Sequence, residues 1–183
     1  QSIQFSINPP EGEFFRDPAN QLHVTLLQNE QWTTALNGLK PQYNNGARLE
    51  YRYDAESRFE GGNEFLFFDT KNIQITTANV SYVELNRLYE TYLTPDFFRR
   101  GYPYSFIQDL NGDFRIRTLQ GSENGAAEAD YSWVHFSLST PMLLKDQEIY
   151  VYGKFNNYQL NEVNKMYFNP SLEIYEGVIL LKQ

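Results

Sequence analysis

Alternation of apolar and polar residues, the pattern of a half-buried β-strand, recurs along this chain of 183 residues. It begins at Ile3, Phe5 and Ile7 and stops at Pro9-Pro10, because proline cannot donate to a β-ladder. Further strands are predicted at residues 22–28, 49–53, 64–68, 72–77, 80–85, 131–138, 148–153, 164–169 and 174–183. The pattern therefore favours an all-β fold.

Residues 81–93 fit either a hairpin or a helix. Their apolar positions roughly follow a helical period, but Asn86-Arg87 also marks a tight turn between two runs. We expect the hairpin, because the neighbouring strands would otherwise lose a partner. Asn45-Gly46 is a plausible turn, and Asn111-Gly112 between alternating runs predicts a hairpin over about 104–118.

The stretch QGSENGAAEAD at residues 120–130 is small, polar and acidic, without apolar periodicity. Such a composition is typical of a loop or linker. We therefore expect two β-domains, residues 1–122 and residues 123–183, with the later strands spaced as in a β-sandwich.

Composition agrees with strands and excludes several partners. Tyr and Phe number 14 each and aromatic residues make up 16% of the chain, which suits pleated, half-buried surfaces. A net charge of -8 disfavours binding to nucleic acid or to a membrane surface. No stretch is long and apolar enough to span a bilayer, and the N-terminal residues lack the layout of a secretory signal. Without cysteine, disulfides and thiolate metal sites are excluded.

The sequence offers no motif for catalysis. His23 and His135 each lie within an alternating strand rather than beside a Ser or Asp motif, and no glycine-rich phosphate loop is present. We expect no enzymatic activity and no cofactor.

One segment begins like a calcium-binding loop. Asp109, Asn111 and Asp113 place oxygen ligands at alternate positions, as a hard cation requires. Phe114 then stands where the loop needs glycine, and Gln120 stands where it needs a bidentate glutamate. The asparagine-glycine turn explains these residues without a metal, and we expect no metal site.

Two stretches are candidates for surface contacts. In LTPDFFRRGYPYSF, at residues 93–106, aromatic side chains surround a pair of arginines, and both types are enriched in interface hot spots. The candidate partner-binding residues there are Phe97, Phe98, Arg99, Arg100, Tyr102 and Tyr104. The same rings could instead fill a seam between two sheets.

The second stretch is the turn in IYVYGKFNNYQL, at residues 149–160. It is either a carbohydrate-binding turn or the corner of a β-sandwich, and we favour the corner. The candidate carbohydrate-binding residues are Lys154, Asn156, Asn157 and Tyr158.

Several long motifs, in order, resemble one protein family. They are LLQNEQWTTALNGLKP, RFEGGNEFLFFDTKNIQ, YLTPDFFRRGYPYSFIQDLNGDFRIR, EADYSWVHFSL and IYVYGKFNN. Together they are similar to the Bacteroidetes family DUF5103, described as the plug protein of the type IX secretion system. The C-terminal part is also similar to early-set immunoglobulin-like domains that include glycogen-binding modules. Tyr158 stands where the corresponding turn of those modules has tryptophan, which weakens a stacking platform.

The resemblance implies two immunoglobulin-like, early-set β-sandwich domains, the second truncated before its closing strand. It implies a periplasmic protein, associated with the outer membrane, that occludes the type IX translocon barrel by binding it. Family members carry a signal peptide and further domains, so we expect this chain to be a fragment of such a protein.

Overall fold

Strands dominate the computed structural model of this protein, which describes residues 2–59, 61, 65–99, 108–119, 127, 129–140, 144 and 146–182. The α-helix that the structure describes from end to end is the single turn α1 (Pro18–Gln21). The chain divides into two compact units, Gln1–Asn63 and Glu64–Gln183. The prediction of a mostly β fold is therefore confirmed.

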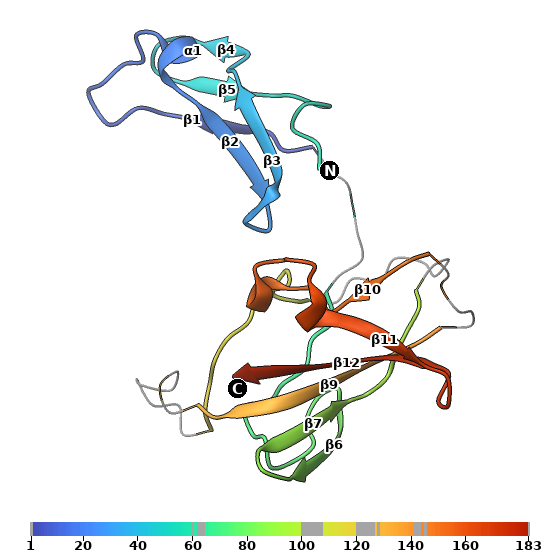
Figure 1. Ribbon diagram of the computed structural model, residues 1–183. Helices are drawn as coiled ribbons and strands as arrows, with labels where there is room; N and C mark the ends of the chain where they lie inside the picture. Colours follow the sequence, from blue (N-terminus) through green and yellow to red (C-terminus); the bar gives the residue numbers. More distant parts are fainter. Residues whose placement is uncertain are drawn as a thin grey trace. The chain divides into compact units, whose positions relative to one another are not determined.

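The first unit contains a three-stranded sheet and a hairpin (Figure 1). The sheet has the order β1–β5–β4, and the hairpin joins β2 to β3. Their bounds are β1 (Phe5–Ile7), β2 (Val24–Gln28), β3 (Gln31–Leu39), β4 (Tyr43–Asn44) and β5 (Leu49–Tyr51).

A small core holds the first unit together. Leu49 and Tyr51 of β5 are fully buried, and Val24 and Leu39 from the hairpin pack with them. The Phe5 ring stacks on Tyr51 with centroids 4.5 Å apart. Packing of this kind removes apolar surface from water, about 1.5–3 kcal/mol for each large side chain fully buried.

The sequence predicted strands β1, β2 and β5 of this unit. The strands near Ile7 and Val24 form, and the turn at Asn45-Gly46 joins β4 to β5, with Gly46 in the left-handed conformation at φ +80°. Strands β3 and β4 and the helical turn α1 were not predicted. Strand β3 begins beside a turn at Asn29-Glu30 in which both residues have positive φ, as a tight hairpin turn requires.

The second unit is built on a seven-stranded sheet with the order β10–β11–β12–β9–β7–β6, and β8 also pairs with β9. Figure 1 shows β9 and β12 side by side in the middle of this sheet. The bounds are β6 (Val80–Leu85), β7 (Tyr89–Leu93), β8 (Asp96–Phe97), β9 (Tyr131–Ser139), β10 (Ile149–Tyr150), β11 (Lys165–Asn169) and β12 (Ile174–Lys182), with short 3-10 turns η1 (Lys154–Asn156) and η2 (Glu162–Asn164).

Alternation sorts the side chains of this sheet onto two faces. On one face, which we call the inner face, Val134 and Ile179 are buried opposite each other, and Thr91 and Ser132 share a buried hydrogen bond of 2.7 Å. Loop segments cover this face: the Phe68 ring meets Phe136 edge-on with centroids 5.7 Å apart. In the described residues no second sheet covers it, so the described strands of this unit form one open sheet.

The division between units falls at residues 63 and 64 rather than at the expected 122 and 123. Strand β7 pairs in parallel with β9, from Tyr89 opposite Ser132 to Tyr92 opposite His135. Because this ladder joins residues on both sides of position 122, the expected boundary lies inside one sheet.

Three further strand predictions differ from the structure. Residues 65–68 and 72–77 form turns and irregular segments, and Ile73 is buried there as part of the loop. The turn at Asn111-Gly112 is present, with φ of 54° and 78°, but residues 108–119 form no strand. Residues 104–107 of that predicted hairpin lie outside the described residues. The hairpin preferred over a helix for residues 81–93 is confirmed by β6 and β7.

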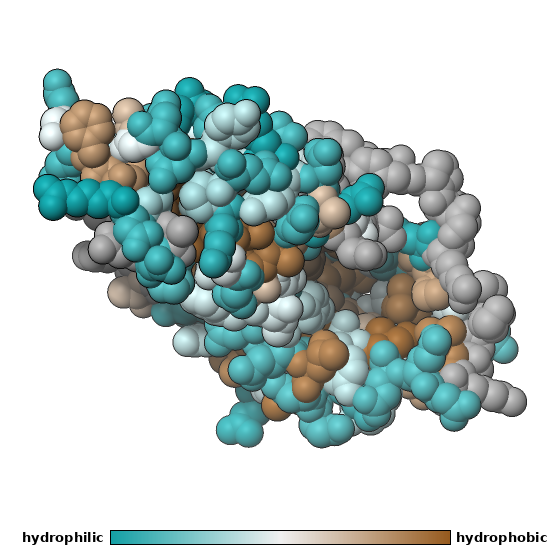
Figure 2. All heavy atoms as spheres, turned by 90° about the horizontal axis from the view of Figure 1, so that it is seen from above, coloured by the Kyte–Doolittle hydropathy of each residue, from teal (hydrophilic) through white to brown (hydrophobic). Residues whose placement is uncertain are grey.

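The space-filling view shows a mostly hydrophilic surface, with hydrophobic residues in separate groups (Figure 2). Among the described residues, no helix is long and apolar enough to cross a membrane.

Candidate functional site

The partner-binding stretch predicted from the sequence leads from the end of β7 into β8. Strand β8 adds in parallel to β9, with Phe97 opposite Ser139, and the Phe98 amide donates to the Ser139 carbonyl at 3.0 Å. Phe97 is 66% exposed. The Arg99 guanidinium lies 3.4 Å from the Asp96 carboxylate. Arg100, Tyr102 and Tyr104 lie outside the described residues.

The other predicted stretch, the turn at residues 153–158, is held by its own side chains. The Asn156 amide donates to the Gln159 carbonyl at 2.9 Å, and its oxygen accepts from the Gly153 amide at 3.4 Å. Asn157 is exposed and closes η1 in the left-handed conformation. The Asn156 amide, proposed as a sugar ligand, therefore stabilises the turn itself.

This turn also binds the loop around Asn111-Gly112. The Lys154 amide donates to the Gly112 carbonyl at 2.8 Å, and the Tyr158 hydroxyl donates to the Asn111 carbonyl at 3.0 Å. The Lys154 ammonium lies 3.1 Å from Asp113. The pKa of Asp113 is lowered, first by the backbone amide of the next residue and then by Lys154. The arrangement is that of a structural corner that joins two loops.

The face of the seven-stranded sheet opposite its inner face carries the largest exposed set of aromatic and aliphatic side chains on these strands. We call it the outer face. Its residues include Tyr82, Glu84, Glu90, Tyr92, Tyr131, Trp133, His135, Tyr167, Glu176, Val178, Leu180 and Lys182. By the pairing of Phe97 with Ser139, the Phe97 side chain projects from this face as well.

Several of these side chains are well exposed for their size. Trp133 is 39% exposed and lies opposite Leu180, which is 40% exposed. Tyr82 and Tyr167 each expose more than half of their surface. An open β-sheet face with this composition can contact a partner through shape and apolar burial.

A polar cluster crosses the middle of the outer face. His135 Nε2 lies 2.6 Å from Glu90 Oε2, and the His135 ring stacks on Tyr92 with centroids 4.0 Å apart. The hydrogen bond from His135 is the main reason that the pKa of Glu90 is lowered. Burial, followed by the nearby carboxylates, raises the pKa of Tyr92. One of the two histidines therefore contacts a carboxylate on the outer face of the sheet.

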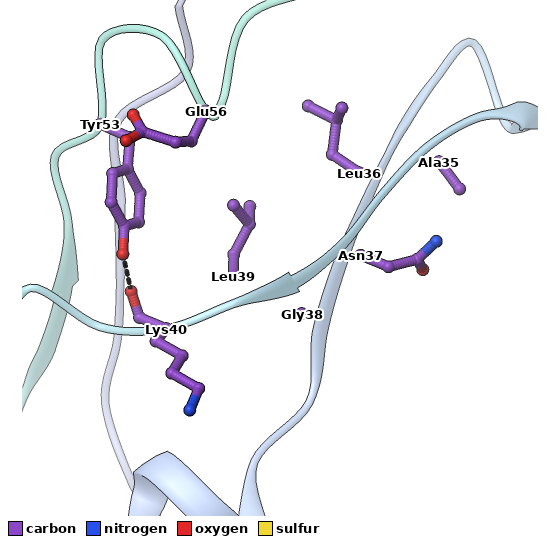
Figure 3. Close-up of a pocket in the computed structure, with 8 residues that line it drawn as sticks. All are labelled: Ala35, Leu36, Asn37, Gly38, Leu39, Lys40, Tyr53 and Glu56. Carbon is purple, nitrogen blue, oxygen red and sulfur yellow. Dashed lines mark hydrogen bonds between the residues drawn. The ribbon is translucent and has the colours of Figure 1, made fainter.

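The first unit contains a hollow beside β3. Its volume is about 540 Å³. Residues 35–40 line it together with Tyr53 and Glu56 (Figure 3). The Tyr53 hydroxyl donates to the Lys40 carbonyl at 2.7 Å along one side of it. Across the described ranges, no three His, Asp or Glu side chains lie close enough together to hold a metal ion.

The outer face was not among the sites predicted from the sequence. A signal was present, because Tyr131, Trp133 and His135 alternate with inner-face residues along a single strand. The sequence alone could not show which of the two faces is covered.

Neither a family model nor a curated protein matches this chain. Its fold matches the crystal structure of a hypothetical protein from Parabacteroides merdae, with a TM-score of 0.81 and 29% sequence identity. The alignment covers 98% of this chain and 45% of that protein, so this chain spans less than half of its length. The likeness shows that the mostly β architecture is shared along nearly the whole chain.

Proposed function

We propose that this chain is a non-catalytic protein-interaction module of a periplasmic plug, which occludes the outer-membrane translocon of type IX secretion. The observation that carries the proposal is the outer face of the seven-stranded sheet. Trp133, Leu180 and Tyr82 lie there among polar groups, without a covering layer in the described residues. Phe97 extends the same face toward the stretch predicted to bind a partner.

The composition of the outer face suits protein docking. A stable protein interface buries at least about 1,200 Å² of combined surface, with aromatic or arginine side chains near its centre. Trp133 and the tyrosines provide the aromatic groups, and Glu90 with His135 provides a polar pair among them. A partner that covers this face would remove partly exposed apolar surface from water, at about 25 cal/mol for each Å².

The identity of the partner rests on the motif resemblance to the plug family. The structural neighbour comes from a species of the Bacteroidetes, the bacterial group in which the plug family occurs. Its description states no partner or activity. We accordingly propose periplasmic localisation, association with the outer membrane, and the type IX translocon barrel as the partner.

We also propose that the second unit is related to early-set immunoglobulin-like domains. Strands β10, β11 and β12 are consecutive antiparallel neighbours. Strand β12 then returns to pair with β9, the first of these four strands along the chain. This is a Greek-key arrangement, which immunoglobulin-like sandwiches share. We propose that the first unit is also related to early-set immunoglobulin-like domains.

Affinity purification of the tagged, full-length protein from native outer membranes tests the function. Replacing Trp133 and Leu180 together by serine should reduce recovery of the translocon barrel. The matched control replaces Leu160 and Val163 by serine, because both are exposed but lie outside the sheet. Equal recovery with the outer-face variant and the control, from preparations with unchanged unfolding curves, would refute docking through this face.

A further inference from the structure

The seven-stranded sheet ends at β6, and this edge can accept another strand. In the described part of the chain, β6 pairs with β7 alone and is the last strand on its side (Figure 1). Edge strands present backbone N–H and C=O groups that favour pairing with an added strand. The sequence of β6, VSYVEL, contains neither proline nor lysine, the residues that commonly protect such an edge.

The turn after β6 shows which backbone groups face outward. The Asn86 amide donates to the Leu88 carbonyl at 3.0 Å. Hydrogen-bonded and non-hydrogen-bonded pairs alternate along an antiparallel ladder, so Glu84 and Glu90 form the next hydrogen-bonded pair. The backbone N–H and C=O of Val83, one residue earlier, therefore point away from β7.

The same alternation directs the backbone groups of Leu85 outward. Its side chain is 64% exposed, which agrees with an accessible edge. At the other end of β6, a bulge between Val80 and Tyr82 interrupts the ladder. The accessible edge is therefore short and centred on Val83 and Leu85.

The charge of Glu84 indicates which kind of strand would bind at this edge. Glu84 lies directly opposite Glu90, and like charges in that position destabilise a sheet. Glu90 has His135 as its partner, whereas the partners of Glu84 among the described residues are neutral donors from Tyr82, Tyr92 and Asn86. An added strand would place one of its side chains beside Glu84 on the outer face.

A second copy of β6 would bring no cation to Glu84, because VSYVEL contains no basic residue. We propose that β6 binds an extended segment of a partner protein by β-strand addition, and that this segment places a lysine or arginine beside Glu84. The proposal rests on the proposed function as a protein-interaction module, and it specifies the form and charge of the bound segment.

The probe is a short fluorescent peptide of alternating valine and lysine, with a valine-glutamate peptide of the same length as its control. Val83→Pro removes the outward N–H while leaving the ladder to β7 intact, and Val83→Ala controls for the lost side chain. We expect the basic peptide to bind. In NMR spectra of the protein, its binding should change the chemical shifts of the Val83 and Leu85 amides. Val83→Pro should weaken peptide binding about tenfold, the loss expected when one backbone hydrogen bond to the peptide is removed and the adjacent one is disturbed. Val83→Ala keeps the backbone N–H and should leave the affinity unchanged.

Absence of binding, equal binding by the acidic peptide, equal binding to Val83→Pro, or shifts confined to other residues would overturn the proposal. If Val83→Pro does not fold, Glu84→Lys tests the proposal instead. The Glu84→Lys protein should bind the acidic peptide and should no longer bind the basic peptide. Translocon recovery separates the two proposals. Undiminished recovery with a folded Val83→Pro protein would refute strand addition alone, whereas no recovery with the unaltered protein would refute the proposed function alone.

Discussion

Replacing Gly112 by alanine tests how the corner of the second unit is built. Gly112 has φ +78°, and a β-carbon there would lie 2.8 Å from the Phe65 ring. The left-handed backbone costs an alanine roughly 1–2 kcal/mol. Moving the Phe65 ring, which packs beside Tyr152 and Tyr158, adds an overpacking cost of about 1–3 kcal/mol. We expect Gly112→Ala to lower the free energy of unfolding of the second unit by roughly 2–5 kcal/mol.

The chain offers a matched control and a convenient signal. Gly12 has φ +83° and no atom within 4 Å of the place that a β-carbon would take, so Gly12→Ala carries the backbone strain without the clash. Trp32 lies in the first unit and Trp133 in the second, so tryptophan fluorescence in guanidinium can follow each unit once the other tryptophan is replaced by phenylalanine. If Gly112→Ala costs its unit no more than Gly12→Ala costs the first unit, the Phe65 ring does not pack against the turn.

Four further changes test individual contacts. The lowered pKa of Glu90 means that its charged form stabilises the fold above the ordinary pKa of 4.5, and that this stability is lost as the pH falls through the lowered value. Glu90→Gln should therefore flatten the acid side of the stability curve, and an unchanged curve would contradict this. Tyr158→Phe removes the hydrogen bond to the Asn111 carbonyl and should cost about 0.5–1.5 kcal/mol in urea unfolding, whereas no loss would exclude that bond. In the carbohydrate-binding alternative, calorimetry would detect oligosaccharide binding that Tyr158→Ala removes. Arg99→Glu with Arg100→Glu should weaken translocon binding without altering the unfolding curve, and unchanged binding would remove these arginines from the contact.

Local pattern predicted the strands of this protein better than it predicted their partners. The alternation over Val80–Leu85 and the turn at Asn86-Arg87 gave the β6–β7 hairpin correctly. The parallel ladder between β7 and β9 joins residues about forty positions apart, and periodicity contains no information about such pairing. The predicted boundary at 122/123 was wrong for this reason.

The turn at Asn111-Gly112 shows a different limit. Both residues adopt the positive φ that the dipeptide favours, yet the carbonyls of the turn accept hydrogen bonds from Lys154 and Tyr158 rather than closing a ladder within residues 108–119. Tertiary contacts decide what a turn connects. Likewise, the alternation of Trp133 and His135 was visible in the sequence, but only the loops packed on the inner face show that the other face is open.

Site-specific photo-crosslinking in cells tests the central claim most directly. A photoreactive amino acid at position 133 or 180 places the crosslinker on the outer face, and one at position 163 places it on an exposed site outside the sheet. Docking through the outer face predicts crosslinks to the type IX translocon barrel from positions 133 and 180 and none from position 163. Crosslinks from position 163 alone, or no crosslink to the barrel from either outer-face position, would contradict it.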